Sequence, residues 1–300
     1  MTTCTKCGES VPRDAAFCEN CGNAVKAVHG LSVEAAEMAS ADGSVGSGTT
    51  DVDLSVIGEV VASASHRGRR HTDNQDAVGI RQLRHGVALA VADGVSTSSR
   101  ARAAADTAVR VAIDVLDARE EIDDDSMCEA VRLANEAVRA LEYTPVPSLA
   151  EPQATLVLAI VQGNRVRYAW VGDSRLYLVS GSDTRAITED DSWLNDSIKK
   201  GMPYSDAIKH PDAHCITQCL GMRDGDPVIH VSSMMIEAGS WLALCSDGLW
   251  NYLESVDTLH DLMRLQDSAD QPVQKAERLV EFANGRGGHD NITVALYRSV

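Results

Sequence analysis

The sequence has no long apolar run and little positive charge. It has no stretch of about eighteen consecutive apolar residues, so we expect no membrane-spanning helix. The opening segment Met1-Thr2-Thr3-Cys4 has no charged stretch followed by an apolar one, so we expect no secretory signal and a cytoplasmic location. The 27 Lys and Arg residues are outnumbered by 44 Asp and Glu, for a net charge of −17. Such acidity repels nucleic acid and anionic membranes and argues against both as partners.

Half of the eight cysteines of the chain lie near its start, in two closely spaced pairs. The spacing is Cys4-x2-Cys7, then ten residues, then Cys18-x2-Cys21. Two intervening residues let one tight turn present both thiolates of a pair, and two such turns supply the tetrahedral ligands of Zn²⁺. Free or disulfide-bonded cysteines are the alternative, which a reducing compartment disfavours. We therefore predict a zinc ribbon over residues 1–24, with zinc supplying its folding energy.

The remaining composition predicts a linker and one large domain. Residues 25–53 are rich in Ala, Ser, Gly and Thr and are typical of a flexible linker. Residues 54–300 alternate apolar, Val- and Ile-rich runs with two alanine-rich helical patterns. The expected strands are Ser55–Ser63, Val87–Ala92, Ala154–Val161, Arg165–Val171, Leu176–Val179, Val228–Val231, Trp241–Cys245 and Ile292–Tyr297. The expected helices are Arg100–Leu116, Met127–Leu141, Asp206–Lys209 and Val273–Ala283. Hairpin-like spacing predicts an α+β sandwich of antiparallel sheets flanked by helices.

Four aspartates stand in four short motifs along this domain. They are Asn74-Gln75-Asp76, Asp93-Gly94, Ser246-Asp247-Gly248 and His289-Asp290-Asn291. Each motif except the first lies at or beside the end of an expected strand, and strand ends bring their carboxylates to one edge of a sheet. Clustered buried anions are unstable unless they are protonated or hold cations. Oxygen ligands alone suit Mg²⁺ or Mn²⁺, so the pattern predicts a hard divalent metal site and a metal-dependent hydrolase.

The motifs together resemble the bacterial type 2C (PPM family) metal-dependent protein serine/threonine phosphatases. The resemblance runs from about residue 56 to 297 and also rests on Val171-Gly172-Asp173-Ser174-Arg175, Asp191-Ser192 and Ile216-Thr217-Gln218-Cys219-Leu220-Gly221. It implies an α-β-β-α sandwich with two metal ions between the sheets. By resemblance, Asp93 bridges both ions, Asp247 and Asp290 complete one site, and Asp76 with the Gly94 carbonyl completes the other.

The resemblance also implies a third metal site, a flap and a mechanism. Asp173 with Asp247 corresponds to a third, weaker metal site, and residues of about 189–221 correspond to the flap beside the active site. The implied reaction is hydrolysis of phosphoserine and phosphothreonine by in-line attack of a metal-bridging hydroxide. Phosphorylated proteins, the substrates of serine/threonine kinases, are the implied partners, together with a protein partner for the zinc ribbon. A catalytically weak sensing or adaptor module is the alternative. The chain has no Cys-x5-Arg loop, which counts against a cysteine-dependent phosphatase.

Two positions depart from the family pattern. An arginine that grips the substrate phosphate normally stands where this chain has His71. One of the nearby arginines, Arg69 or Arg70 among them, replaces it, or His71 itself binds phosphate or donates a proton to the leaving group. The second departure is the run Ser96-Thr97-Ser98 after Asp93-Gly94, where the family often has Gly-Gly after a Met or His. We expect these hydroxyls to cap the helix that follows rather than to shape the phosphate pocket.

Overall fold

The structure is a computed structural model that describes residues 2–3, 10–11, 52–181, 183–264 and 271–300. The chain divides into two units, Met1–Thr49 and Thr50–Val300. In the first unit, strands β1 (Thr2–Thr3) and β2 (Ser10–Val11) form an antiparallel pair. The four ribbon cysteines and nearly all of the expected linker lie outside the described residues.

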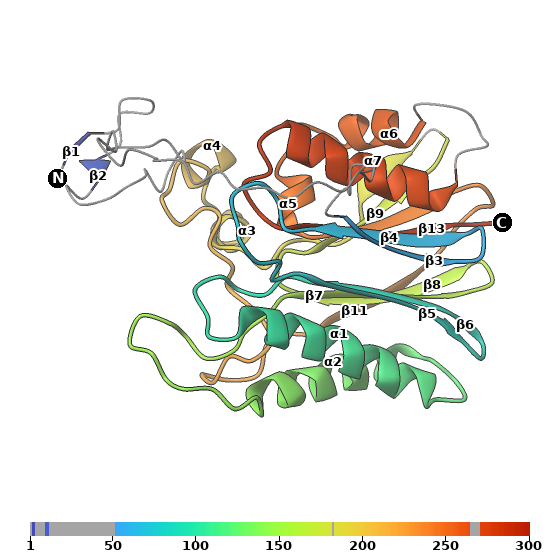
Figure 1. Cartoon of the computed structure of the whole chain (residues 1–300), viewed down its shortest axis with the longest axis horizontal. Helices are drawn as coiled ribbons and strands as arrows, with labels where there is room; N and C mark the ends of the chain where they lie inside the picture. Colours follow the sequence, from blue (N-terminus) through green and yellow to red (C-terminus); the bar gives the residue numbers. More distant parts are fainter. Residues whose placement is uncertain (1, 4–9, 12–51, 182, 265–270) are drawn as a thin grey trace, which may run out of the picture. The chain divides into compact units, whose positions relative to one another are not determined.

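The second unit contains two antiparallel sheets that pack face to face (Figure 1). The six-stranded sheet has the order β10-β9-β12-β13-β4-β3, and the five-stranded sheet has the order β11-β8-β7-β6-β5. The strands of the first are β3 (Asp53–Ile57), β4 (Val61–His66), β9 (Arg175–Val179), β10 (Thr184–Ala186), β12 (Trp241–Cys245) and β13 (Ile292–Arg298). The strands of the second are β5 (Ala77–Leu83), β6 (Gly86–Ala92), β7 (Leu156–Gln162), β8 (Arg165–Val171) and β11 (His230–Met235).

Branched and aliphatic side chains fill the space between the two sheets. Leu89 and Val157 of one sheet and Leu244 and Ala295 of the other belong to a single buried cluster. Burial of this kind stabilises the fold by roughly 25 cal/mol per Å² of apolar surface and holds the two sheets against each other. The central strands are buried on both faces, which is why they appear in the sequence as continuous apolar runs.

Helices cover the two outer faces (Figure 1). Helices α1 (Ala101–Asp117) and α2 (Asp124–Arg139) pack on the five-stranded sheet, and the buried alanines of α1, such as Ala104 and Ala108, allow a close approach. Helices α6 (Val256–Arg264) and α7 (Pro272–Gly285) pack on the six-stranded sheet. The predicted α-β-β-α sandwich is therefore confirmed. No helix in the described ranges is long and apolar enough to span a bilayer.

The prediction of one strand over Ser55–Ser63 is wrong. The segment forms the hairpin of β3 and β4, with a turn at residues 58–60. Gly58 has a φ of 57°, a left-handed conformation that glycine adopts without a Cβ penalty. The apolar run hides the turn because Val56 and Ile57 precede it, Val60 lies within it and Val61 follows it.

The core between the sheets predicts a large effect for truncating Leu244, which has no exposed surface. We expect Leu244→Ala to lower the free energy of unfolding by about 2–5 kcal/mol through lost burial and a residual cavity. The matched control is Val56→Ala, whose side chain on the edge strand β3 is 52% exposed and should cost less than about 1 kcal/mol. Urea unfolding of the full chain measures both, and equal losses would contradict this account of the core.

Candidate functional site

Five aspartates leave the two sheets at the same end of the sandwich. Ala77 of β5 pairs with Ala92 of β6, so Asp76 and Asp93 are the next residues beyond that pair. Asp173 lies two residues after the end of β8, and Thr155, just before β7, donates its backbone N–H to the Asp93 carbonyl at 2.8 Å. In the other sheet, Asp247 follows β12 and Asp290 precedes β13, its antiparallel neighbour.

A buried serine joins the two sheets at this end. The Ser246 hydroxyl donates to Oδ2 of Asp76 at 2.6 Å and accepts the backbone N–H of Thr293 at 3.0 Å. Ser246 follows β12 of the six-stranded sheet, and Asp76 precedes β5 of the five-stranded sheet. The contact therefore fixes one carboxylate against the opposite sheet.

The loops around these aspartates approach too closely for larger residues. A Cβ added at Gly94 would lie 2.3 Å from the Ala101 carbonyl oxygen, and one added at Gly248 would lie 1.9 Å from the Asn291 carbonyl oxygen. Asn291 is 2% exposed and accepts the Gln75 N–H at 2.6 Å. Its side-chain amide also donates to backbone carbonyls at residues 67 and 73. Asn291 thus holds together the loops that carry Asp76 and Asp290.

Burial and mutual repulsion raise the pKa of four of the five carboxyls. Burial is the main cause of the strong rise in the pKa of Asp93, and the charges of Asp76, Asp247, Asp290 and Asp173 add to it. Burial raises the pKa of Asp247 well above its usual value, and the charge of Asp173 reinforces that rise. Burial raises the pKa of Asp76 to about 7, against the opposing hydrogen bond from Ser246. The pKa of Asp173 also rises to about 7, through burial and then the charge of Asp190.

Two oxygens of this cluster lack any hydrogen-bond donor. Oδ1 of Asp76 and Oδ1 of Asp247 are both buried and, within the described part of the chain, accept no hydrogen bond. A buried carboxylate oxygen without a donor is costly unless a cation or a proton meets it. The donor set consists of carboxylate oxygens, with the Gly94 backbone beside them, and such oxygens are the ligands that Mg²⁺ and Mn²⁺ prefer. The residues present therefore fit divalent cations.

The carboxylates are neighbours rather than a closed cage. In the ranges that the structure describes, no three His, Cys, Asp or Glu side chains surround one point in a metal-binding geometry. Four of the carboxylates, Asp93, Asp173, Asp247 and Asp290, line an open cleft of about 350 Å³. Its lining consists of Asp93, Val95, Ser96, Thr97, Thr155, Asp173, His214, Cys215, Ile216, Asp247 and Asp290.

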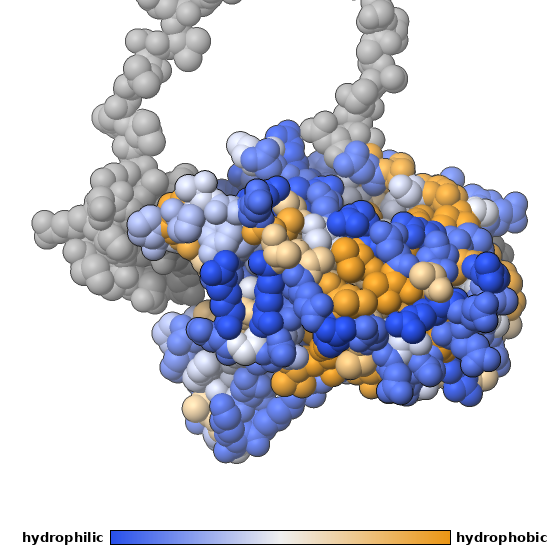
Figure 2. All heavy atoms as spheres, turned by 90° about the horizontal axis from the view of Figure 1, so that it is seen from below, coloured by the Kyte–Doolittle hydropathy of each residue, from blue (hydrophilic) through white to orange (hydrophobic). Residues whose placement is uncertain are grey.

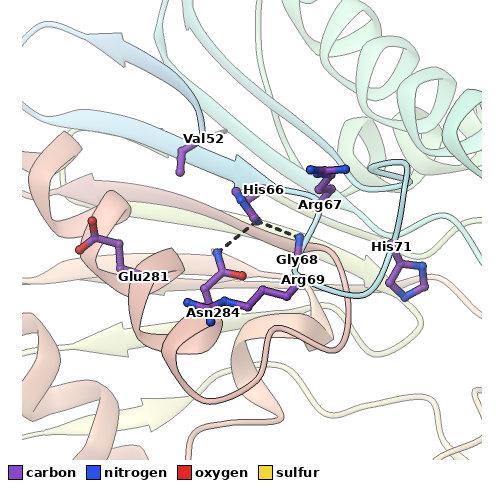
Figure 3. Close-up of a pocket in the computed structure, with 8 residues that line it drawn as sticks. All are labelled: Val52, His66, Arg67, Gly68, Arg69, His71, Glu281 and Asn284. Atoms are coloured by element: carbon purple, nitrogen blue, oxygen red, sulfur yellow. Dashed lines mark hydrogen bonds between the residues drawn. The ribbon is translucent and has the colours of Figure 1, made fainter. Parts of the chain in front are cut away.

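The three residues predicted to grip phosphate lie in different places. His71 stands at the edge of the cleft, with Nε2 3.5 Å from Oδ1 of Asp290 and its side chain 35% exposed. Arg69 lines a neighbouring cavity and extends toward Asn284, away from His71 (Figure 3). Arg70 is exposed and lines neither cavity. Of the three, the structure brings only His71 into contact with a residue of the carboxylate cluster.

The expectation that Ser96, Thr97 and Ser98 cap the following helix is wrong. Helix α1 begins after Arg100, a left-handed residue with a φ of 56°, and no side chain caps it. The Ser96 hydroxyl donates instead to the Gln75 side chain at 3.1 Å, and Ser96 and Thr97 line the cleft. The hydroxyls of Ser96 and Thr97 therefore help to shape the pocket, which was the less favoured of the two expectations.

The flap segment at residues 189–221 closes one side of the cleft. Trp193 of α3 (Trp193–Lys199) stacks on His210 at 3.9 Å, so this tryptophan packs within the flap. The Asp191 carboxylate accepts the Gly172 N–H at 2.9 Å and lies 2.8 Å from Nε2 of His230. This contact ties the flap to the turn that carries Asp173.

Sequence reasoning assigned no role to several residues that the structure places at the site. Ser246 and Asn291 appeared only as parts of motifs and Thr155 only within an expected strand, yet each holds an aspartate-bearing loop through a hydrogen bond. The available signal for these residues was a small polar side chain directly beside an apolar strand. His214 and Cys215 line the cleft from the flap, and nothing in the sequence pattern marked them.

Comparison with known proteins identifies the family. The family model described as protein phosphatase 2C matches residues 63–283, and a zinc-ribbon domain model matches residues 3–25. The chain belongs to the protein phosphatase 2C family. The predictions of this family and of a zinc-ribbon relationship at the start of the chain are both confirmed.

Named relatives are bacterial. Protein phosphatase PhpP of Streptococcus pneumoniae is 39% identical over 142 residues, which cover 47% of this chain and 55% of that protein. Serine/threonine phosphatase stp of Listeria welshimeri is 30% identical over 238 residues, which cover 77% of this chain and 92% of that protein. The matched part thus spans about half the length of PhpP and nearly all of stp.

A solved structure has the same fold. The catalytic domain of serine/threonine protein phosphatase PstP, in complex with two manganese ions, superposes with a TM-score of 0.65 at 27% identity. The superposition covers 82% of this chain and 98% of that one.

The raised pKa of Asp76 predicts that this carboxylate destabilises the metal-free protein. A carboxyl whose folded pKa lies near 7, against its usual 3.8, binds more protons folded than unfolded, so stability falls as pH rises from about 4 to about 7. We expect Asp76→Asn in EDTA to exceed wild type in unfolding free energy by about 1–3 kcal/mol at a pH of about 8, with little gain at a pH of about 4.

Thermal and urea unfolding at the two pH values measure this gain. Asp257→Asn, a change at an exposed position of α6, is the control for a general effect of removing negative charge. If wild type is more stable than Asp76→Asn at the higher pH in EDTA, the conclusion that ionised Asp76 destabilises the metal-free protein is refuted.

Proposed function

We propose that this chain is a metal-dependent protein phosphatase that hydrolyses phosphoserine and phosphothreonine in proteins. The observation that carries the proposal is the convergence of five carboxylates at one end of the sandwich, where four of them line the cleft and two buried oxygens accept no hydrogen bond from the described residues. Family membership and the manganese-bound PstP relative support this activity over a sensing module.

The proposed ligand assignment follows the positions of the strand ends. Asp93, in the middle of the cluster, would bridge two ions. Asp247 and Asp290 from the six-stranded sheet would complete one site, and Asp76 with the Gly94 carbonyl would complete the other. Asp173, which interacts electrostatically with both Asp93 and Asp247, would hold a third ion with Asp247. Bound Mg²⁺ or Mn²⁺ supplies Lewis-acid chemistry, because it lowers the pKa of a water nucleophile and offsets phosphoryl charge.

The protein's own groups position the substrate. The open cleft admits a phosphorylated side chain, and the hydroxyls of Ser96 and Thr97 on its wall can donate hydrogen bonds to phosphate oxygens. His71 at the cleft edge can donate to the phosphate or protonate the leaving alkoxide. Burial raises the pKa of the Cys219 thiol to about 12 and that of Cys245 further, so neither forms a thiolate nucleophile at neutral pH.

We further infer that Cys4, Cys7, Cys18 and Cys21 bind Zn²⁺ and that the ribbon docks a protein partner. The match of residues 3–25 to a zinc-ribbon domain supports the first point. Thiolate ligands require reduced cysteines, which fits a cytoplasmic enzyme that acts on the products of serine/threonine kinases. Residues 1–24 would then be the zinc ribbon, residues 25–53 the linker and residues 54–300 the phosphatase domain.

Metal-dependent turnover is the first test of the proposed function. We expect hydrolysis of p-nitrophenyl phosphate and of a phosphothreonine peptide with Mn²⁺ or Mg²⁺, and none in EDTA. Asp93→Asn removes the charge shared by both proposed ions and should lower kcat by on the order of a hundredfold or more.

The exposed Asp257→Asn variant is the matched control and should retain wild-type turnover. Folded wild-type protein that stays inactive with every divalent metal would overturn the proposal and favour the sensing module. Asp93→Asn with undiminished kcat would overturn the assignment of Asp93 alone.

His71 is expected to bind the substrate phosphate, because its imidazole stands beside Asp290 at the edge of the cleft. We expect His71→Gln to raise KM for p-nitrophenyl phosphate by about three- to tenfold, the value of one charge-assisted hydrogen bond. His71→Arg should restore KM, since guanidinium also binds phosphate. A fall in kcat that arginine does not rescue would assign His71 to proton donation instead.

A further inference from the structure

A second cavity, of about 480 Å³, lies beside the carboxylate cleft. Its lining consists of Val52, His66, Arg67, Gly68, Arg69, His71, Glu281 and Asn284, and we call it the arginine pocket (Figure 3). The two cavities adjoin at His71, which lines the arginine pocket and stands 3.5 Å from Asp290, a lining residue of the cleft.

The charge of the arginine pocket is opposite to that of the chain. Among the described residues of its lining, Arg67 and Arg69 carry permanent positive charges and Glu281 carries a negative one. The whole chain carries a net charge of −17. A positive pocket on so acidic a protein, next to a cluster of five carboxylates, favours anions that the rest of the surface repels.

Hydrogen bonds fix the floor of the pocket. Nδ1 of His66 accepts the Gly68 N–H at 2.9 Å and lies 3.1 Å from the Asn284 side-chain nitrogen (Figure 3). A ring nitrogen that accepts a backbone N–H carries no proton, so in neutral His66 the proton is on Nε2. These two contacts fix the orientation of the His66 ring in the lining of the pocket.

The same loop is rigidly placed against the cleft. Gly68 has a φ of 75°, and a Cβ there would lie 2.1 Å from the Asp290 carbonyl oxygen. The Arg69 N–H donates to the Gly288 carbonyl at 2.7 Å. The loop that bears both arginines is therefore fastened to the backbone that bears Asp290. A group held in the arginine pocket lies at a set position relative to the reacting phosphate.

We propose that the arginine pocket binds an anionic side chain of the substrate next to the phosphorylated residue. The shared chemistry is a planar or tetrahedral oxyanion, either an Asp or Glu carboxylate or a second phosphate, which guanidinium binds through paired N–H donors. The proposal rests on the proposed phosphatase function and adds a substrate class to it. Arg69 then holds the flanking anion, while His71 faces the scissile phosphate.

Matched phosphothreonine peptides test the proposal. One peptide has neutral flanks, two carry glutamates on the amino-terminal or the carboxyl-terminal side, and two carry phosphoserine there. The readout is the ratio of kcat/KM for each charged peptide to that of the neutral one, which cancels effects on the chemistry itself. We expect wild type to favour charged peptides on one side by about three- to tenfold, and added salt to reduce the ratio.

Two variants with opposite effects sharpen the test. Arg69→Gln should bring the ratio toward one, whereas Glu281→Gln removes the competing negative charge and should raise it. A merely structural disturbance would not move the ratio in opposite directions. The glutamate and phosphoserine peptides tell whether a carboxylate suffices or a phosphate is required.

Equal ratios in wild type and both variants would overturn the arginine pocket as a substrate site while leaving the phosphatase function intact. No hydrolysis of any peptide, the neutral one included, with Mn²⁺ or Mg²⁺ would instead overturn the proposed function on which this inference rests. The neutral peptide thus separates the two failures.

Discussion

Repulsion among five aspartates at one end of the sandwich is the constraint around which the site is arranged. Burial makes Asp93 costly to ionise, and the negative charges of Asp76, Asp247, Asp290 and Asp173 add to that cost. Such a cluster destabilises the fold at neutral pH unless positive charge enters it. Divalent cations fit because the donors are oxygens and because two of those oxygens accept no hydrogen bond from any residue that the structure describes. The carboxylate cluster that destabilises the metal-free fold is thus the same feature that suits it to divalent cations.

The two sheets make this repulsion tolerable. Four of the carboxylates, Asp93, Asp173, Asp247 and Asp290, lie within two residues of the ends of β6, β8, β12 and β13. These strands contribute buried side chains to the core between the layers, so the four aspartates cannot separate without disrupting that core. Ser246 and Asn291 add hydrogen bonds that hold loops from opposite sheets together. The close contacts at Gly94 and Gly248 leave no space for a side chain. The rigidity of the site therefore derives from the apolar core rather than from the polar residues that carry the chemistry.

The sequence predicted the site best where a strand ends directly on an aspartate. Asp93 and Asp247 follow buried apolar runs, so periodicity alone placed them at a sheet edge. Asp76 was the exception, because β5 begins Ala77-Val78-Gly79 and contains Arg81 and Gln82, which hide a strand that is half exposed. The hairpin turn at Gly58 was hidden for the opposite reason, since apolar residues flank it on both sides. Local pattern cannot reveal a left-handed start such as Arg100, which depends on how the preceding loop packs against residues 150–153.

Long-range juxtaposition was out of reach of the sequence, and it is what distinguishes His71 from Arg69. The two residues lie two positions apart and were equal candidates for gripping phosphate. The loop that carries them is fixed at Gly68 against Asp290 and at Arg69 against Gly288, so it turns His71 toward the carboxylates and Arg69 toward Asn284. The proposed cation-binding cleft and the proposed anion-binding pocket consequently adjoin at His71. A phosphoprotein substrate offers both groups such a surface requires: a phosphate for the metal side and, where its sequence is acidic, a second anion for the arginines.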